Sequence, residues 1–122
     1  MRSAAQPDFA GHVRTCQQFC SAFGIFWPSG SSPTSLEPVF GGGSGLVEGV
    51  NNAQRTVGFR FDPQHGNRAF VWWPGLTSIQ QLGGSRGYSN TQAYDINNLS
   101  PAQAVGYGQS ANGSRAIVWT IP

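Results

Sequence analysis

The chain has 122 residues, a formal net charge of +2 and a charged fraction of only 10%. It contains no lysine, which excludes a P-loop, and its arginines are scattered rather than clustered as in a nucleic-acid binder. No stretch approaches the ~18 apolar residues of a membrane helix, so no membrane span is expected.

Residues 1–21 are expected to form an N-terminal segment, at most a degenerate half of the repeat described below. Its two cysteines, Cys16 and Cys20, fit either one local disulfide across a tight turn or two buried, unpaired thiols. Two such residues alone do not make a zinc site. Val13–Phe23 is the best candidate for a helix, and Met1–Gly11 has no apolar run that would serve as a signal peptide.

Residues 41–84 read as a first full copy of an all-β repeat. The residues between its glycine pairs alternate between β-branched or aromatic segments and turn-forming segments. The expected strands are Leu46–Val50, Thr56–Phe61, Arg68–Trp73 and Thr77–Leu82. One copy therefore holds about four short antiparallel strands.

Residues 85–122 repeat this order. Ile96-Asn97-Asn98 follows Val50-Asn51-Asn52 by 46 residues, and Trp119 follows Trp72 by 47. Asn112-Gly113 is a strong hairpin signal between the last two strands. A weaker echo, Ala22–Trp27, marks residues 22–40 as a partial copy, so that residues 22–122 form one repeat region.

A period of about 46 residues with four strands per copy is typical of a β-propeller blade. The predicted fold is therefore all-β, with propeller-like tandem repeats in an incomplete array of about 2.5 blades, the last copy lacking its last strand. Unpaired strand edges and a low surface charge favour association. The chain is expected to assemble with copies of itself as a ring or filament; the alternative is a fragment of a larger propeller.

The repeated elements resemble the HAF family of extracellular bacterial repeats, whose pattern runs Gly-Gly, Ile-Asn-Asn, Val-Val-Gly and His-Ala-Phe-Leu-Trp. The resemblance covers about residues 40–120. The matching residues are Gly41-Gly42, Val50-Asn51-Asn52, Val57-Gly58 and Arg68–Trp72, then Gly83-Gly84, Ile96-Asn97-Asn98, Val105-Gly106 and Arg115–Trp119. Arg68 and Arg115 replace the family's His, so no role of that His transfers. The resemblance implies a propeller-like fold, an extracellular or surface location and no known reaction.

The tryptophans at the repeat period, Trp27, Trp72 and Trp119, are expected to pack in the core. Trp73 points to the opposite face of its strand, where an indole serves either as a stacking platform for a sugar or as packing between blades. Together with Tyr88, Arg68 and Arg115, Trp73 forms the candidate ligand-binding set.

The Asn-Asn pairs fit two interpretations, turn closure through their side chains or ligand binding through their amides. His65, three residues after Asp62, is typical of solvated surface rather than of a metal or acid–base site. No catalytic motif emerges: Gly42–Leu46 lacks the last glycine of a nucleophile elbow, and the five carboxylates form no recognisable pair.

The sequence thus favours a non-enzymatic, self-assembling repeat protein with no cofactor and no metal. A carbohydrate-binding module completed by oligomeric closure is the alternative, with the candidate ligand-binding set lining sites between blades. A hydrolase with a site assembled across blades is a third hypothesis.

Overall fold

A computed structural model describes residues 9–16, 20–27, 34–35, 44–62, 64, 66–83 and 87–121, with side chains from residue 44 onward. These residues form three antiparallel sheets and no helix. The N-terminal sheet holds β1 (Phe9–Cys16), β2 (Cys20–Trp27) and β3 (Thr34–Ser35). The central sheet holds β4 (Gly45–Val50), β5 (Thr56–Asp62), β6 (Gly66–Trp72) and β7 (Gln80–Gln81). The C-terminal sheet holds β8 (Asn90–Ile96), β9 (Ala102–Ser110) and β10 (Gly113–Ile121).

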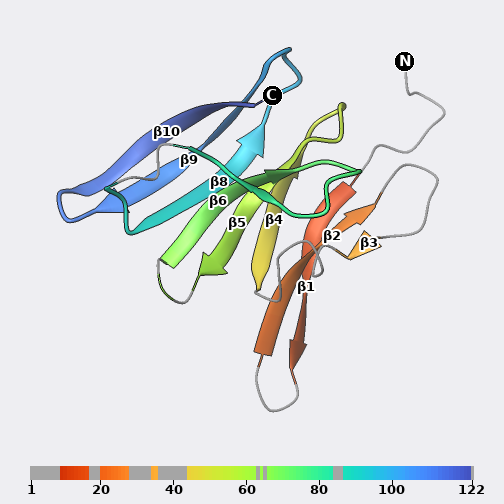
Figure 1. Cartoon of the computed structure of the whole chain (residues 1–122), viewed down its shortest axis with the longest axis horizontal. Helices are drawn as coiled ribbons and strands as arrows, with labels where there is room; N and C mark the ends of the chain where they lie inside the picture. The colour runs from red at the N-terminus through yellow and green to blue at the C-terminus, as the bar shows by residue number, and fades with distance from the viewer. Residues whose placement is uncertain are drawn as a thin grey trace.

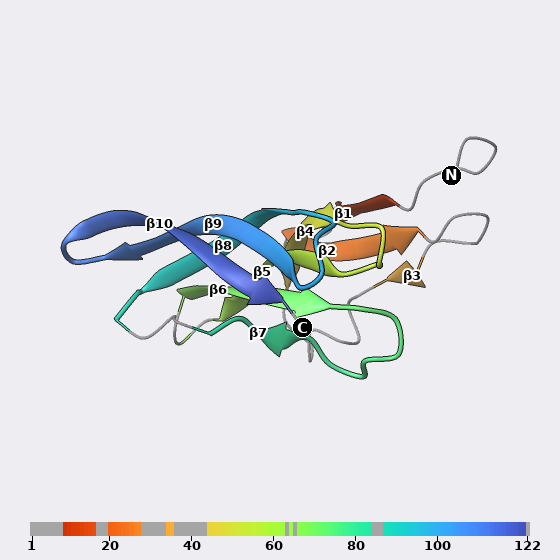
Figure 2. The ribbon, with the colours of Figure 1, turned by 90° about the horizontal axis from the view of Figure 1, so that it is seen from above.

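The three sheets follow one another across the molecule in chain order, with the N-terminal and C-terminal sheets at opposite ends (Figures 1 and 2). Strand β8 packs against β4, β5 and β6, and β4 in turn packs against β1 and β2. Each sheet is a simple meander in which neighbouring strands are consecutive in sequence.

The central and C-terminal sheets pair their matched segments in the same register. Val57 pairs with Val71 in the central sheet, as Val105 pairs with Val118 in the C-terminal sheet. In both sheets the pairing of the first strand with the second passes over one residue at the same place. This residue lies between Val47 and Gly49 in the central sheet and between Ala93 and Asp95 in the C-terminal sheet. The bulged residues are therefore Glu48 and Tyr94.

The glycine of the Val-Gly element has a steric cause. A Cβ at Gly58 would collide with the carbonyl oxygen of Leu46, and one at Gly106 with that of Gln92. In both sheets the backbone of the first strand approaches this glycine directly. The same element thus fixes the same close contact in each sheet.

The backbone of the N-terminal sheet follows part of the same pattern. Phe26 pairs with Thr34 and Ile25 with Ser35, as Val71 pairs with Gln80 and Phe70 with Gln81. β1, β2 and β3 therefore correspond to β5, β6 and β7. This register agrees with the echo of the repeat in Ala22–Trp27.

The strands of the central sheet present a set of buried apolar side chains on each face. Val57, Ala69 and Val71 join residues of the C-terminal sheet in one core cluster. The alternate residues Phe70 and Trp72 form a second cluster with Val47. The first cluster is completed by Leu82, Ala93, Ile96, Ala102, Ala104, Trp119 and Ile121.

The structure corrects two expectations about local structure. Val13–Phe23 is not a helix, because it overlaps β1 and β2, which pair antiparallel over their full length. The strand expected over Thr77–Leu82 is only the two-residue β7. The hairpin that Asn112-Gly113 predicts is confirmed. Its two loop residues are Ala111 and Asn112, between the paired Ser110 and Gly113, and Gly113 has a positive φ of 109°.

Candidate functional site

The outward face of the C-terminal sheet carries an apolar pair that its central counterpart buries. Val57 and Val71 are 0% and 1% exposed, whereas Val105 and Val118 are 46% and 61% exposed. The difference arises because β8 covers the central pair and no described strand covers the C-terminal pair. Identical side chains in identical register thus have opposite environments.

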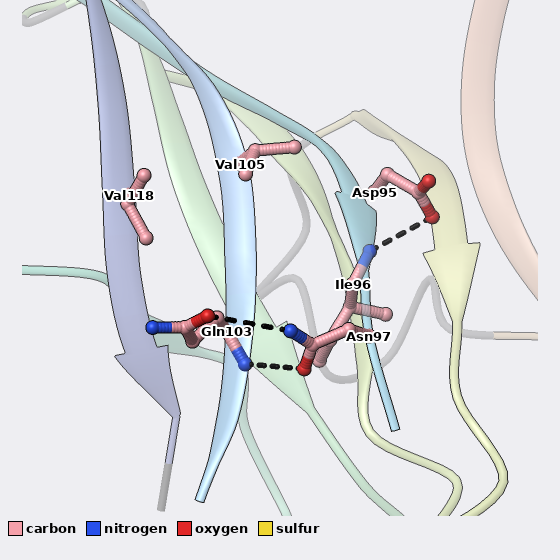
Figure 3. Close-up of a pocket in the computed structure, with 6 residues that line it drawn as sticks. All are labelled: Asp95, Ile96, Asn97, Gln103, Val105 and Val118. Carbon is pink, nitrogen blue, oxygen red and sulfur yellow. Dashed lines mark hydrogen bonds between the residues drawn. The ribbon is translucent and has the colours of Figure 1, made fainter. Parts of the chain in front are cut away.

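A hollow of about 270 Å³ lies on this face beside the two valines (Figure 3). Asp95, Ile96, Asn97 and Gln103 complete its lining. The Oδ1 atom of Asn97 accepts hydrogen bonds from the main-chain nitrogens of Gln103, at 2.8 Å, and of Leu99, at 3.2 Å. The Asp95 Oδ1 atom accepts one from the nitrogen of Ile96 at 2.8 Å. The polar wall of the hollow is therefore held in place by its own turn.

Two tyrosines extend the same face toward the other end of β8. The rings of Tyr94 and Tyr107 are stacked, with centroids 5.8 Å apart and planes 10° apart, and Tyr94 is 45% exposed. The Tyr94 hydroxyl donates to the Gln92 Oε1 atom at 2.8 Å. Partial burial, Tyr107 and the Glu48 carboxylate raise the pKa of Tyr94. The ring of Tyr94 is thus held in a fixed orientation at the surface.

The structure brings two of the four residues of the predicted ligand-binding set together and places the other two elsewhere. The Arg68 Nη1 atom donates to the carbonyl oxygen of Tyr88 at 3.1 Å, which brings those two together. Arg115 is exposed on β10. Trp73 directly follows the last residue of β6 and packs against the core between the central and C-terminal sheets. The guanidinium carbon of Arg55 lies over its ring, 4.2 Å from the ring centroid. This position of Trp73 supports packing between sheets rather than an open platform.

Asn51 and Asn97 close turns, as the first interpretation of the Asn-Asn pairs states. The Asn51 Oδ1 atom accepts from the nitrogen of Arg55 at 2.8 Å, in the same way as Asn97 and Gln103. Trp72 and Trp119 are 5% and 7% exposed, which confirms their predicted packing role. Tyr94 was missed because its repeat position holds Glu48 in the central sheet, so the sequence pattern does not select it.

Several sequence predictions fall outside what the structure describes. His65, Gly41-Gly42 and Gly84 are not described, nor is the side chain of Trp27. Cys16 and Cys20 are paired positions in the register of β1 and β2, but the state of their thiols stays a prediction.

Among the side chains from residue 44 onward that are described, no three His, Cys, Asp or Glu lie close enough to hold a metal ion. No helix in the described residues is long and apolar enough to cross a membrane. A scan against protein-family models and searches of curated proteins and solved structures found no match to this chain.

Proposed function

We propose that the chain is a non-enzymatic repeat protein of the extracellular space or cell surface that assembles with copies of itself into a ring or filament. Its sheets are propeller-like blades in this proposal, as the resemblance to HAF repeats implies. The uncovered Val105–Val118 pair carries the proposal, because the same pair in the central sheet is buried under a neighbouring sheet.

The edge of the C-terminal sheet gives further support. The outer edge of β6 is paired with β7, whereas no described strand pairs with the outer edge of β10. A strand edge that no described strand pairs with, beside an exposed apolar pair, is a surface that another sheet can extend and cover. Because the two ends of the stack differ, a contact between one end and the other is heterologous and generates rings or filaments.

Sedimentation velocity of the wild type and of two variants tests this function. Val118→Asp places a charge on the proposed interface and is expected to abolish association. Phe61→Asp is the matched control, since Phe61 is also an exposed apolar strand residue, at 49%, but lies on β5. Association that survives Val118→Asp as fully as Phe61→Asp would overturn the proposal.

A sugar site is the second candidate, favoured by the oriented ring of Tyr94. A ring held by a stacked neighbour and by Gln92 offers a platform at little cost in side-chain entropy. In calorimetric titrations with neutral oligosaccharides, Tyr94→Ala is expected to abolish binding and Tyr94→Phe to retain most of it. Equal binding by wild type and Tyr94→Ala would remove this candidate.

A further inference from the structure

Two hydrogen bonds connect a turn of the central sheet with a turn of the C-terminal sheet. The Asn51 Nδ2 atom donates to the carbonyl oxygen of Asn97 at 3.0 Å. The main-chain nitrogen of Asn52 donates to the Asn98 Oδ1 atom at 2.7 Å. The turn that precedes β5 and the turn that precedes β9 are therefore fixed against each other.

A hollow of about 200 Å³ lies between these two turns. The turn of the central sheet lines it with Asn51, Ala53 and Arg55, and the opposite turn contributes Asn98 and Ser100. Among the described lining residues, only Arg55 carries a charge. The volume is smaller than the roughly 300 Å³ at which pockets for drug-sized ligands begin. The hollow therefore suits one small ring rather than an oligosaccharide.

The guanidinium of Arg55 is held in place from two sides. Its central carbon lies over the ring of Trp73, 4.2 Å from the centroid, and the main-chain nitrogen of Arg55 donates to the Asn51 Oδ1 atom at 2.8 Å. The Nη1 atom approaches the Ala53 carbonyl oxygen at 3.4 Å, beyond the usual range of N–H···O bonds. A guanidinium over an aromatic face keeps N–H donors along its edge, where two of them match the oxygens of a carboxylate.

The pairing of Arg55 with Trp73 is not part of the repeat. Arg55 and Gln103 hold equivalent positions, because the main-chain nitrogen of each donates to the first asparagine of its turn. Trp73 corresponds to Thr120, since each directly follows the core tryptophan of its sheet. The C-terminal sheet forms the same turn without this charge and this ring. The turn therefore does not explain why the central sheet carries them.

The opposite side of the hollow supplies uncharged polar groups. The Asn98 Oδ1 atom accepts from the Asn52 nitrogen, which fixes the orientation of the amide and leaves Nδ2 as a donor. No described residue accepts from this Nδ2 atom. Ser100 adds a hydroxyl, which both donates and accepts. Such groups match the hydroxyls of a sugar, while the single charge of Arg55 matches one carboxylate better than a doubly charged phosphate.

We propose that this hollow binds one sugar ring that carries a carboxylate. The carboxylate lies on the guanidinium of Arg55, the ring hydroxyls lie at Asn98 and Ser100, and Trp73 is a positioning residue for Arg55. This inference goes beyond the proposed self-association and does not depend on it, because one chain supplies both sides of the hollow. The site is also separate from Tyr94, which does not line the hollow.

NMR titration of the wild type tests the ligand class. Glucuronate is expected to shift the Arg55 Nε–H signal and the Asn98 side-chain amide signals. It is expected to bind at least about tenfold more tightly than acetate or glucose, because each of these offers only part of the recognised groups. Acetate binding as tight as that of glucuronate would overturn the sugar ring, and tighter binding of inorganic phosphate would overturn the carboxylate. Glucuronate that shifts neither signal would overturn the site.

Two substitutions of Arg55 test its role. Arg55→Gln removes the charge, and Arg55→Lys keeps the charge but loses the planar pair of donors. Both are expected to raise the dissociation constant of glucuronate at least about tenfold in calorimetric titrations. Asn112→Asp, in the exposed β9–β10 turn, changes the net charge as Arg55→Gln does and is expected to bind like wild type. Equal weakening by Asn112→Asp, or unchanged binding by Arg55→Lys, would contradict recognition by the guanidinium.

Substitutions of Trp73 separate positioning from packing. Trp73→Leu keeps an apolar side chain but removes the aromatic face, and is expected to weaken glucuronate binding about threefold. Trp73→Phe restores an aromatic face and is expected to restore most of the binding. The affinity of the folded protein is the decisive readout, since a purely structural role would change only the stability. Equal affinities for Trp73→Leu and Trp73→Phe would contradict the positioning role.

Discussion

The central and C-terminal sheets place equivalent valine pairs in the same register, yet one pair is buried and the other is exposed. Val57 and Val71 lie beneath β8, whereas Val105 and Val118 face outward. The contrast shows that the repeat determines strand pairing within a sheet, while burial depends on the next sheet. Each such sheet presents an apolar face that becomes buried only when a neighbouring sheet packs on it.

The two sheets are expected to differ most in free energy of unfolding when a charged side chain replaces one valine of each pair. Val71→Asp buries an unpaired carboxylate and is expected to lower the free energy of unfolding by about 3–5 kcal/mol. Val118→Asp, at the same repeat position, is expected to change it by less than about 0.5 kcal/mol in dilute, unassociated protein. Urea denaturation of both variants measures the difference, and equal losses would contradict the contrast in burial.

The Val-Gly glycines are expected to respond alike in both sheets, because each meets a main-chain carbonyl of the first strand. Gly58→Ala and Gly106→Ala are each expected to cost about 2 kcal/mol of unfolding free energy through overpacking. Gly83→Ala is the control, since a Cβ there meets nothing within 4 Å. Thermal unfolding compares the three, and a harmless Gly106→Ala would show that the close approach is particular to the central sheet.

Substitutions at Asn51 and Asn97 are expected to differ in their effect on the free energy of unfolding, by a smaller amount than those at the valines. Asn51→Asp loses the bond to the Asn97 oxygen and is expected to destabilise the monomer by about 1 kcal/mol. Asn97→Asp keeps its turn and has no described inter-sheet bond to lose, so its effect on the monomer is expected to be smaller. Chemical denaturation below the association range tests this order, and a larger loss for Asn97→Asp would contradict it.

The smallest expected effect on stability is the titration of Tyr94 at high pH. Because the pKa of Tyr94 is raised above the ordinary 10.0, the folded state holds this proton more tightly than the unfolded state. The resulting stabilisation is complete below pH 10 and is lost as pH rises through the folded pKa. Tyr107→Phe is expected to lower the pKa of Tyr94, and absorbance titration of the phenolate measures it. An unchanged titration would show that Tyr107 does not contribute to the shift.

Much of the pairing was predictable from the sequence. Val57-Gly58 and Val105-Gly106 mark equivalent strands, and Asn112-Gly113 marks the last hairpin, because these local signals depend on backbone geometry. The exposure of Val118 was not predictable, since it depends on which sheet lies beside β10. The inter-sheet bond of Asn51 was not predictable either, because an Asn-Asn pair satisfies a local turn equally well without it.

Hydrogen–deuterium exchange across the chain, at concentrations below and above association, tests most directly whether the face bearing Val105 and Val118 is the assembly surface. Amides in β9 and β10 are expected to gain protection on association, while those of β5 and β6, already covered by β8, are expected to exchange as before. Association that leaves β9 and β10 unchanged and protects other strands would contradict this role of the face.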